Sequence, residues 1–241
     1  MIILCVRSLI FAVCFYSLVV ASAIRFIVWS PSTPEGVQRY QERWLGRITT
    51  AMRVVVGIKS EVRGYENIPD GPVIFASAHQ SAWDTLYWPL FVSKPSIVLK
   101  KELTYIPLFG RMIMNMNSVS INRSMGATAL KSLIRQSRSM VEQQRSIVIF
   151  PTGTRTQPGV RADYKPGVAA LYTNLNMPCV PVSTNLGVFW PRRSFIRKPG
   201  VYVVSFGEPI PPGLKRREFM AQLEQRIETE NERLLEETQN A

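Results

Sequence analysis

The residues most able to do chemistry in this chain are His79 and Asp84, five positions apart. They stand in the segment Ser-Ala-His-Gln-Ser-Ala-Trp-Asp, and His79 is the only histidine in 241 residues. An imidazole that is neutral near physiological pH takes a proton from an alcohol, and a carboxylate behind it fixes the tautomer and stabilises the imidazolium. Such a pair is a Ser-His-Asp triad without its serine, which suggests that the substrate brings the hydroxyl.

The spacing of this pair makes a demand on the backbone. In a continuous helix, a separation of five residues would place the two side chains roughly 140° apart. We therefore expect a loop that enters a helix, because such a turn brings the carboxylate back to the imidazole. A lone histidine is more often structural, so the catalytic interpretation depends on the segments that follow.

A second group of residues has the types that bind an anion. Phe-Pro-Thr-Gly-Thr-Arg, from Phe150 to Arg155, follows an apolar run that predicts a strand. Gly153 permits close backbone approach, Thr152 and Thr154 offer hydroxyls, and Arg155 can hold a phosphate through two parallel hydrogen bonds. An ordinary turn at the end of a strand would show the same residues.

Two more cations follow predicted strands. Arg123 comes two positions after the run Val119–Ile121, and we expect it to contact the same phosphate as Arg155. Lys101 follows the run Ser96–Leu99 and begins the sequence Lys-Glu-Leu. Each of these signals is weak when it is taken alone.

The elements between these residues predict the architecture. Six apolar runs rich in β-branched residues are typical of strands: Val73–Ser77, Ser96–Leu99, Val119–Ile121, Ile147–Phe150, Val180–Ser183 and Val201–Phe206. Helices are predicted at Ala82–Val92, Ser124–Gln143 and Gly167–Asn174, with a final helix after Pro211-Pro212 that carries Phe219, Leu223, Ile227 and Leu234 on one face. This alternation favours an α/β layered domain with a mixed, largely parallel sheet flanked by helices. In such folds the site lies beyond the carboxyl ends of the strands.

The N-terminus predicts a membrane-associated helical segment. No charge occurs from Ser8 to Ile24, and the apolar stretch approaches the roughly 20 residues that cross a bilayer. A signal peptide is the alternative, because Ala21-Ser22-Ala23 imitates a cleavage site. Thr33 then predicts the N-cap of a basic amphipathic helix, which can lie among lipid headgroups or pack on its own domain. We divide the chain into an anchor and amphipathic helix at residues 1–59 and a catalytic domain at residues 60–241.

The composition narrows the choice of partners. The chain has 29 basic and 17 acidic residues, a net charge of +12, which an anionic membrane surface or an anionic substrate would explain. No nucleic-acid motif accompanies the dispersed basic residues, so no nucleic-acid partner is expected. Three cysteines without a paired motif and a single histidine make neither a disulfide framework nor a metal site, and a reducing compartment fits best.

Together and in this order, these segments resemble the glycerolipid acyltransferase family, of the 1-acyl-sn-glycerol-3-phosphate acyltransferase type. The family shows an HxxxxD block, a lysine-glutamate-leucine block that leads to a proline-glycine turn, an arginine step, an FPEGTR-like block and a proline-flanked strand. The matching segments here are His79 to Asp84, Lys101 to Gly110, Asn122-Arg123, Phe150 to Arg155 and Val180-Pro181-Val182. Lys165-Pro166-Gly167 is similar to the family's lysine-x-glycine step. The resemblance covers roughly residues 65 to 210.

The resemblance implies transfer of an acyl group from acyl-carrier protein (acyl-ACP) or acyl-coenzyme A (acyl-CoA) to the 2-hydroxyl of 1-acylglycerol 3-phosphate. It implies His79 as the base, Asp84 as its partner, and Arg123 and Arg155 as phosphate ligands, with no cofactor. Backbone amides near a strand end, together with Lys101, are the implied stabilisers of the oxyanion. The arginines that follow the apolar N-terminal stretch outnumber Arg7 before it, and this positive-inside bias predicts that the catalytic domain lies at the cytoplasmic side of the inner membrane. One position departs from the family: Thr152 stands where glutamate is usual, so another lysolipid acceptor, or an inactive member, is an alternative.

Two other classes of function stay open at this point. A thioesterase or lipase could use the same base on water or on a serine, with Ser81 or Cys179 as nucleophile, although the chain has no GxSxG elbow. A basic membrane-binding or nucleic-acid module would show the motifs by accident. An acyl-transfer assay with and without a lysolipid separates these alternatives.

Overall fold

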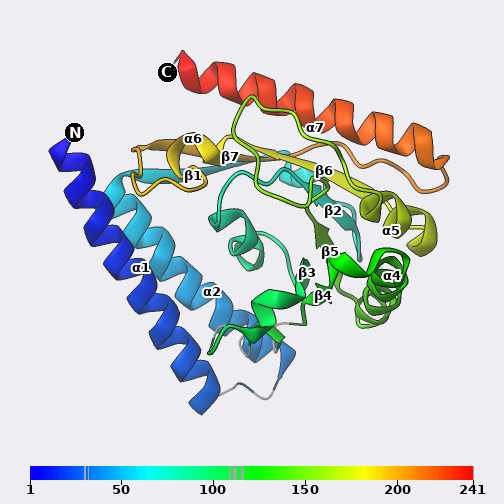
Figure 1. Ribbon diagram of the computed structural model, residues 1–241, viewed down its shortest axis with the longest axis horizontal. Helices are drawn as coiled ribbons and strands as arrows, with labels where there is room; N and C mark the ends of the chain where they lie inside the picture. Colours follow the sequence, from blue (N-terminus) through cyan, green and yellow to red (C-terminus); the bar gives the residue numbers. More distant parts are fainter. Residues whose placement is uncertain (30, 32, 109, 111–112, 115–116, 241) are drawn as a thin grey trace.

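One mixed sheet forms the centre of the molecule in the computed structural model, which describes the chain except residues 30, 32, 109, 111–112, 115–116 and 241. Its order is β1-β7-β6-β2-β5-β3-β4, and the only antiparallel pair in this described sheet is β6 with β7 (Figure 1). The strands are β1 (Ile58–Arg63), β2 (Ile74–Ser77), β3 (Pro95–Lys100), β4 (Val119–Ile121), β5 (Ser146–Ile149), β6 (Cys179–Thr184) and β7 (Gly200–Phe206). The predicted α/β class with a largely parallel sheet is confirmed.

Two layers of helices cover the sheet. One is formed by α4 (Gly126–Glu142), α5 (Gly167–Leu175) and α7 (Arg216–Gln239), whose buried residues share a core with Ile74 and Ala76 of β2. The residue between those two, Phe75, belongs to a second core with the N-terminal helices and Trp88. Successive side chains of β2 thus point to opposite faces of the sheet and pack into the two cores in turn. The short helix α6 (Leu186–Phe189) follows β6.

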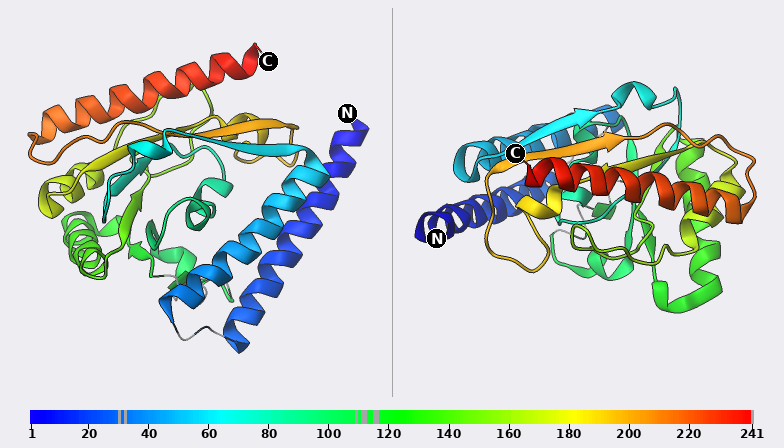
Figure 2. Two further views of the ribbon diagram at one scale, coloured as in Figure 1. Left: turned by 180° about the vertical axis from the view of Figure 1, so that it is seen from behind. Right: turned by 90° about the horizontal axis from the view of Figure 1, so that it is seen from above.

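The N-terminal helices lie side by side along one flank of the molecule (Figures 1 and 2). They are α1 (Ile2–Val28) and α2 (Pro34–Ala51), and a π-helical turn, Met52–Val56, continues α2 towards β1. Thr33 caps α2 as predicted, because its hydroxyl accepts a hydrogen bond from the Gly36 amide. α1 is long and apolar enough to cross a membrane by length and composition.

α1 is nevertheless attached to the rest of the protein along its length. Its Phe11 and Phe26 are buried, the Arg7 guanidinium donates to the Val55 carbonyl at 2.6 Å, and the Ser8 hydroxyl accepts from the Arg197 amide at 2.9 Å. The opposite face of the helix is exposed and apolar, and includes Ile3, Leu9, Val13, Tyr16, Val20 and Ile24. One face of α1 therefore packs on the rest of the protein, and the opposite face is exposed.

One predicted helix is wrong, one strand was not predicted, and one predicted turn lies partly outside the described residues. The predicted helix Ala82–Val92 is instead two short 3₁₀ turns, Trp83–Thr85 and Trp88–Leu90, because Pro89 cannot continue an α-helix and the Asp84 side chain ties up the backbone before it. Strand β1 was not predicted, since Lys59, Ser60 and Glu61 at this sheet edge are exposed. In the predicted proline-glycine turn, Phe109 is outside the described residues.

Candidate active site

His79 and Asp84 meet in the structure although they are not on one helix. The Asp84 Oδ2 atom lies 3.2 Å from His79 Nδ1 and accepts hydrogen bonds from the backbone amides of Gln80 at 2.5 Å and Ser81 at 2.7 Å. The turn between strand β2 and the first 3₁₀ turn folds back on itself, which is the loop-to-helix geometry that the spacing predicts. Asp84 is fully buried, whereas the His79 side chain keeps 15% exposure.

This arrangement leaves one nitrogen of the imidazole for chemistry. An Nδ1–H group that donates to the carboxylate leaves the lone pair on Nε2, and the carboxylate holds the ring in that tautomer. The ring also stacks on Phe150, with centroids 4.2 Å apart and planes inclined by 25°. His79 is thus fixed from the side by a carboxylate and from its face by an aromatic ring.

The backbone around His79 is held by neighbouring loops. The His79 carbonyl accepts from the Thr156 amide at 2.8 Å, and the Gln80 side-chain oxygen accepts from the Gly187 amide at 3.0 Å. The first contact joins the histidine turn to the segment after Phe150, and the second joins it to helix α6. Three separate stretches of chain therefore determine where the imidazole lies.

Strand direction brings the other predicted residues to the same edge of the sheet. Strands β2, β3, β4 and β5 are mutually parallel, so the turns after Ser77, Lys100, Ile121 and Ile149 all emerge at the carboxyl edge. A hollow of about 700 Å³ opens there, within the range of small-molecule sites. Its walls include the apolar side chains of Leu130, Leu133 and Phe150 and the cations Lys100, Arg123 and Lys165.

Arg123 is the best-placed cation of this hollow. Its guanidinium donates to the Gly153 carbonyl, and burial lowers its pKa from the ordinary arginine value, an effect that nearby Glu102 partly offsets. Gly153 has a φ of 67°, and a Cβ there would lie 3.0 Å from the Arg123 Nη1 atom and 3.6 Å from Lys165 Cγ. Glycine at this position is therefore what lets the arginine approach the backbone.

Of the other site residues predicted in the segment after β5, three line the hollow and one does not. Thr152, Gly153 and Thr154 line the hollow, but the Thr152 hydroxyl is buried and donates to the Thr154 carbonyl at 2.9 Å. The Arg155 carbonyl accepts from Arg192 at 2.9 Å, and Arg155 is not among the described residues that line the hollow.

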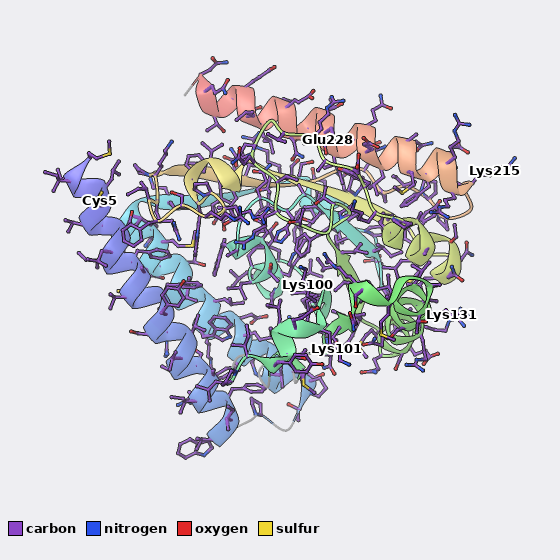
Figure 3. The ribbon with its side chains drawn as sticks, viewed as in Figure 1. Cys5, Lys100, Lys101, Lys131, Lys215 and Glu228 are labelled. Atoms are coloured by element: carbon purple, nitrogen blue, oxygen red, sulfur yellow. The ribbon has the colours of Figure 1, made fainter. Side chains whose placement is uncertain are left out.

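Lys101 starts a 3₁₀ turn after β3 and is likewise absent from the described lining, which holds its neighbour Lys100 (Figure 3). Lys100 and Lys165 are residues of the hollow that sequence reasoning did not select. Lys100 precedes the Lys-Glu-Leu match by one position and is the last residue of β3, whereas Lys101 is the first residue of the 3₁₀ turn. Lys165 lies in a segment with a recognised motif, but its nearness to Gly153 depends on a loop whose path the sequence does not specify.

That loop, from Pro151 to Lys165, is fastened to helix α7. The Tyr164 hydroxyl donates to Glu228 at 2.9 Å, and Arg161 forms an ion pair with Glu232 at 2.6 Å. Burial raises the pKa of both the Tyr164 phenol and the Glu228 carboxyl. Glu228, which is labelled in Figure 3, lies on α7 and holds the loop that carries Thr152 and Gly153 through its hydrogen bond with Tyr164.

The nucleophiles that a hydrolase would need are poorly placed. The Ser81 side chain is fully buried, and its hydroxyl accepts from the Trp83 amide at 3.4 Å. Cys179 is fully buried in strand β6, and burial raises the pKa of its thiol, which disfavours the reactive thiolate. The base at His79 therefore lacks a protein nucleophile among these two candidates.

A base oriented by a carboxylate, beside a cation-lined hollow and without its own nucleophile, defines a class of enzyme. The arrangement fits an enzyme that activates a hydroxyl group of its substrate. Comparison with known proteins makes the class specific: residues 59–185 match the model of the Acyltransferase family. A 1-acyl-sn-glycerol-3-phosphate acyltransferase of Pseudomonas aeruginosa is 35% identical over 187 residues, which is 78% of this chain and 73% of the relative.

More distant relatives agree. A 1-acyl-sn-glycerol-3-phosphate acyltransferase of Cocos nucifera is 27% identical, over 83% of this chain and 66% of its own. The crystal structure of the 1-acyl-sn-glycerophosphate (LPA) acyltransferase from Thermotoga maritima superposes with a TM-score of 0.73 at 23% identity, covering 97% of this chain and 95% of that one. The last comparison shows the fold. The chain belongs to the Acyltransferase family.

Proposed function

We propose that this protein transfers a fatty acyl group from an acyl thioester to the sn-2 hydroxyl of 1-acylglycerol 3-phosphate, giving phosphatidic acid. The observation that carries this proposal is the His79–Asp84 pair at the carboxyl edge of the sheet, next to a hollow with both apolar walls and cations. The names of the relatives from Pseudomonas aeruginosa and Cocos nucifera support the acceptor and the reaction.

The chemistry assigned to the base is a single displacement. The His79 Nε2 atom takes the proton of the acceptor hydroxyl as the oxygen attacks the thioester carbonyl. The tetrahedral intermediate then expels the thiolate, which receives the proton from the imidazolium, so the base is restored without a cofactor. General-base catalysis supplies about 10²–10⁴-fold, and positioning of the two substrates supplies much of the rest.

Arg123 is assigned to the acceptor phosphate. Its guanidinium reaches the Gly153 carbonyl with one nitrogen, and an arginine has further donors that can bind phosphate oxygens. Lys165 beside Gly153 and Lys100, which also lines the hollow, add positive charge. Arg155 and Lys101 keep a supporting role in this proposal, as outer cations near the same edge. The apolar walls of the hollow suit the acyl chain that the acceptor already carries.

Thr152 is assigned a structural role in the loop. Its hydroxyl already donates to the Thr154 carbonyl, and the side chain is buried. Where the family usually has glutamate at this position, the present chain therefore relies on cations and backbone groups to hold the acceptor. Half-buried Gly153 and exposed Thr154 contribute the accessible part of this wall.

The protein is assigned to a membrane surface through α1. The exposed apolar face of that helix has no partner among the described residues, and lipid would cover it. The opposite face packs on the protein and carries Arg7, whose hydrogen bond to Val55 is at the level of strand β1. A helix that is held in this way along its length fits entry into one leaflet better than a free crossing. We place the catalytic domain at the cytoplasmic side of the inner membrane.

The test is an acyl-transfer assay with purified protein in lipid vesicles. A radiolabelled acyl thioester is offered with 1-acylglycerol 3-phosphate, with lysolipids of other headgroups, and without an acceptor. The proposal predicts labelled phosphatidic acid as the main product and little free fatty acid without an acceptor. Rapid release of fatty acid in the absence of acceptor would instead identify a hydrolase.

A further inference from the structure

Helix α4 carries three cations on its outer face. Lys131, Arg135 and Arg138 are exposed and are spaced by four and three residues, which places them on one side of the helix. None of the three forms an ion pair with a described residue. Over the 17 residues of α4, Glu142 at its end is the only acid. We call Lys131, Arg135 and Arg138 the basic stripe.

The basic stripe begins at the edge of the candidate active site. Other residues of the same helix, Ala127, Leu130 and Leu133, line the hollow that also contains Arg123. Lys131 follows Leu130 directly, so the stripe runs from the rim of the hollow outward. At 1.5 Å per residue, its three cations extend over about 10 Å of the helix. A partner that lies on the stripe would therefore have part of its surface at the mouth of the hollow.

The shape of this surface favours a macromolecule over a small ligand. The three cations border a shallow groove between α4 and α5, whose lining also includes Ile134, Ser139, Glu142 and Asn174. Small-molecule sites are usually concave and bury most of their ligand. An open groove with an apolar residue between cations suits an amphipathic acidic helix, which would place carboxylates on the cations and an apolar side chain on Ile134.

The position of the stripe also separates it from the membrane-facing helix. α1 and α4 lie at opposite sides of the molecule in all three ribbon views, and Lys131 is labelled on the side away from α1 (Figures 1, 2 and 3). If the apolar face of α1 enters lipid, the stripe faces the aqueous phase. A soluble partner is the occupant that this geometry favours.

We propose that the basic stripe docks an acidic carrier protein that presents the acyl chain as a thioester. This inference rests on the proposed acyl transfer, and it assigns the donor to a protein-bound thioester. The charged contacts would act mainly on the rate of encounter, since exposed charges of opposite sign steer association. The acyl chain would then enter the hollow from the rim formed by α4.

The test compares two donors in one triple variant, Lys131→Gln with Arg135→Gln and Arg138→Gln. We expect its KM for acyl-carrier protein to rise by about tenfold or more, while kcat with that donor and both constants with acyl-coenzyme A stay within about twofold. The matched control is Lys215→Gln with Arg216→Gln and Arg217→Gln, which removes the same charge from exposed positions where α7 begins (Figure 3). The control should behave as wild type with both donors.

Each other outcome has a defined meaning. Unchanged kinetics of the triple variant with acyl-carrier protein would overturn the docking proposal and leave the acyl transfer intact. An equal loss with both donors, together with weaker binding to vesicles that contain phosphatidylglycerol, would also overturn it, because the stripe would then contact lipid. If wild-type protein transfers acyl groups from neither donor, the proposed function itself fails, and the two failures are thus distinguishable.

Discussion

The candidate site has two halves, the His79–Asp84 pair and the cations around Arg123, and the fold restrains the first more tightly than the second. At the end of β2, the imidazole of His79 is held by a buried carboxylate, by a stacked phenyl ring and by a hydrogen bond on its own carbonyl. At the ends of β4 and β5, Arg123 makes one hydrogen bond to a backbone carbonyl. The imidazole that we propose as the base is therefore positioned before any substrate arrives, whereas Arg123 has further N–H donors without a partner among the described residues.

This difference has a physical reason. A base must be within hydrogen-bond reach of one proton, and misplacement is costly in rate, so three contacts on His79 are used to fix it. A phosphate is a spherical array of acceptors that tolerates several cation geometries, and free donors on Arg123 increase its binding. We therefore expect changes at the base to act on kcat and changes at the cations to act on KM.

The largest expected effect comes from His79→Ala. Loss of the base should lower kcat by about 10²–10⁴-fold, while KM for both substrates changes little. Circular dichroism and binding to lipid vesicles should match wild type, since the side chain is at the surface of the site. Turnover within tenfold of wild type would remove the base from the mechanism.

The next effect, on the same half of the site, comes from Asp84→Asn. The carboxamide can accept from the amides of Gln80 and Ser81 but no longer supplies a charge to the imidazole, so kcat should fall by about 10²-fold or more. Because Asp84 is fully buried, we also expect a loss of about 1–3 kcal/mol in the free energy of unfolding. Urea titration measures this loss, and Asp163→Asn, at an exposed position, is the control.

The cation half is tested by Arg123→Gln. A hydrogen bond to a charged group contributes about 1.5–3 kcal/mol, so KM for the phosphate-bearing acceptor should rise by roughly 10–100-fold with a smaller change in kcat. Arg216→Gln is the matched control at an exposed position. If the variant loses kcat and keeps KM, the guanidinium acts on the transition state and the division between the halves is wrong.

The smallest effect is expected from Thr152→Val, which keeps the shape of the side chain and removes its hydroxyl. The hydrogen bond to the Thr154 carbonyl is lost, which should lower the free energy of unfolding by about 1 kcal/mol. Steady-state kinetics should change by less than about threefold. A large rise in KM for the acceptor would show that the hydroxyl binds substrate.

The two halves were also predictable from the sequence to different degrees. The contact of His79 with Asp84 was expected only if a loop after a strand turned into a helix, and the motifs that follow supported that expectation. The strands that carry both halves show clear apolar runs. The apolar runs predict where each strand ends, and therefore which polar residues follow it. The parallel sheet then brings Ser77, Ile121 and Ile149 to one edge, which alternation of strands and helices also predicts.

What the sequence did not provide depends on tertiary contacts. The direction of Lys100 and Lys101 is decided by how β3 ends, and the place of Lys165 by a loop that Glu228 holds through Tyr164. Strand β1 has little apolar pattern because most of its outward residues face water, and its pairing with β7 is made across 142 positions of chain, from Ile58 to Gly200. The segment Ala82–Val92 has apolar residues at helical spacing, yet Pro89 and the Asp84 contacts divide it into two turns.

The most direct test of the account is an exchange of acceptors in the two variants His79→Ala and Arg123→Gln. Each is assayed with 1-acylglycerol 3-phosphate and with monoacylglycerol, which offers the same hydroxyl without the phosphate. A base that serves any hydroxyl and a cation that serves the phosphate predict an equal fractional loss of kcat/KM on both acceptors in His79→Ala. In Arg123→Gln, they predict a loss on the phosphate acceptor alone. The same pattern of loss in both variants would contradict the separation of the two roles.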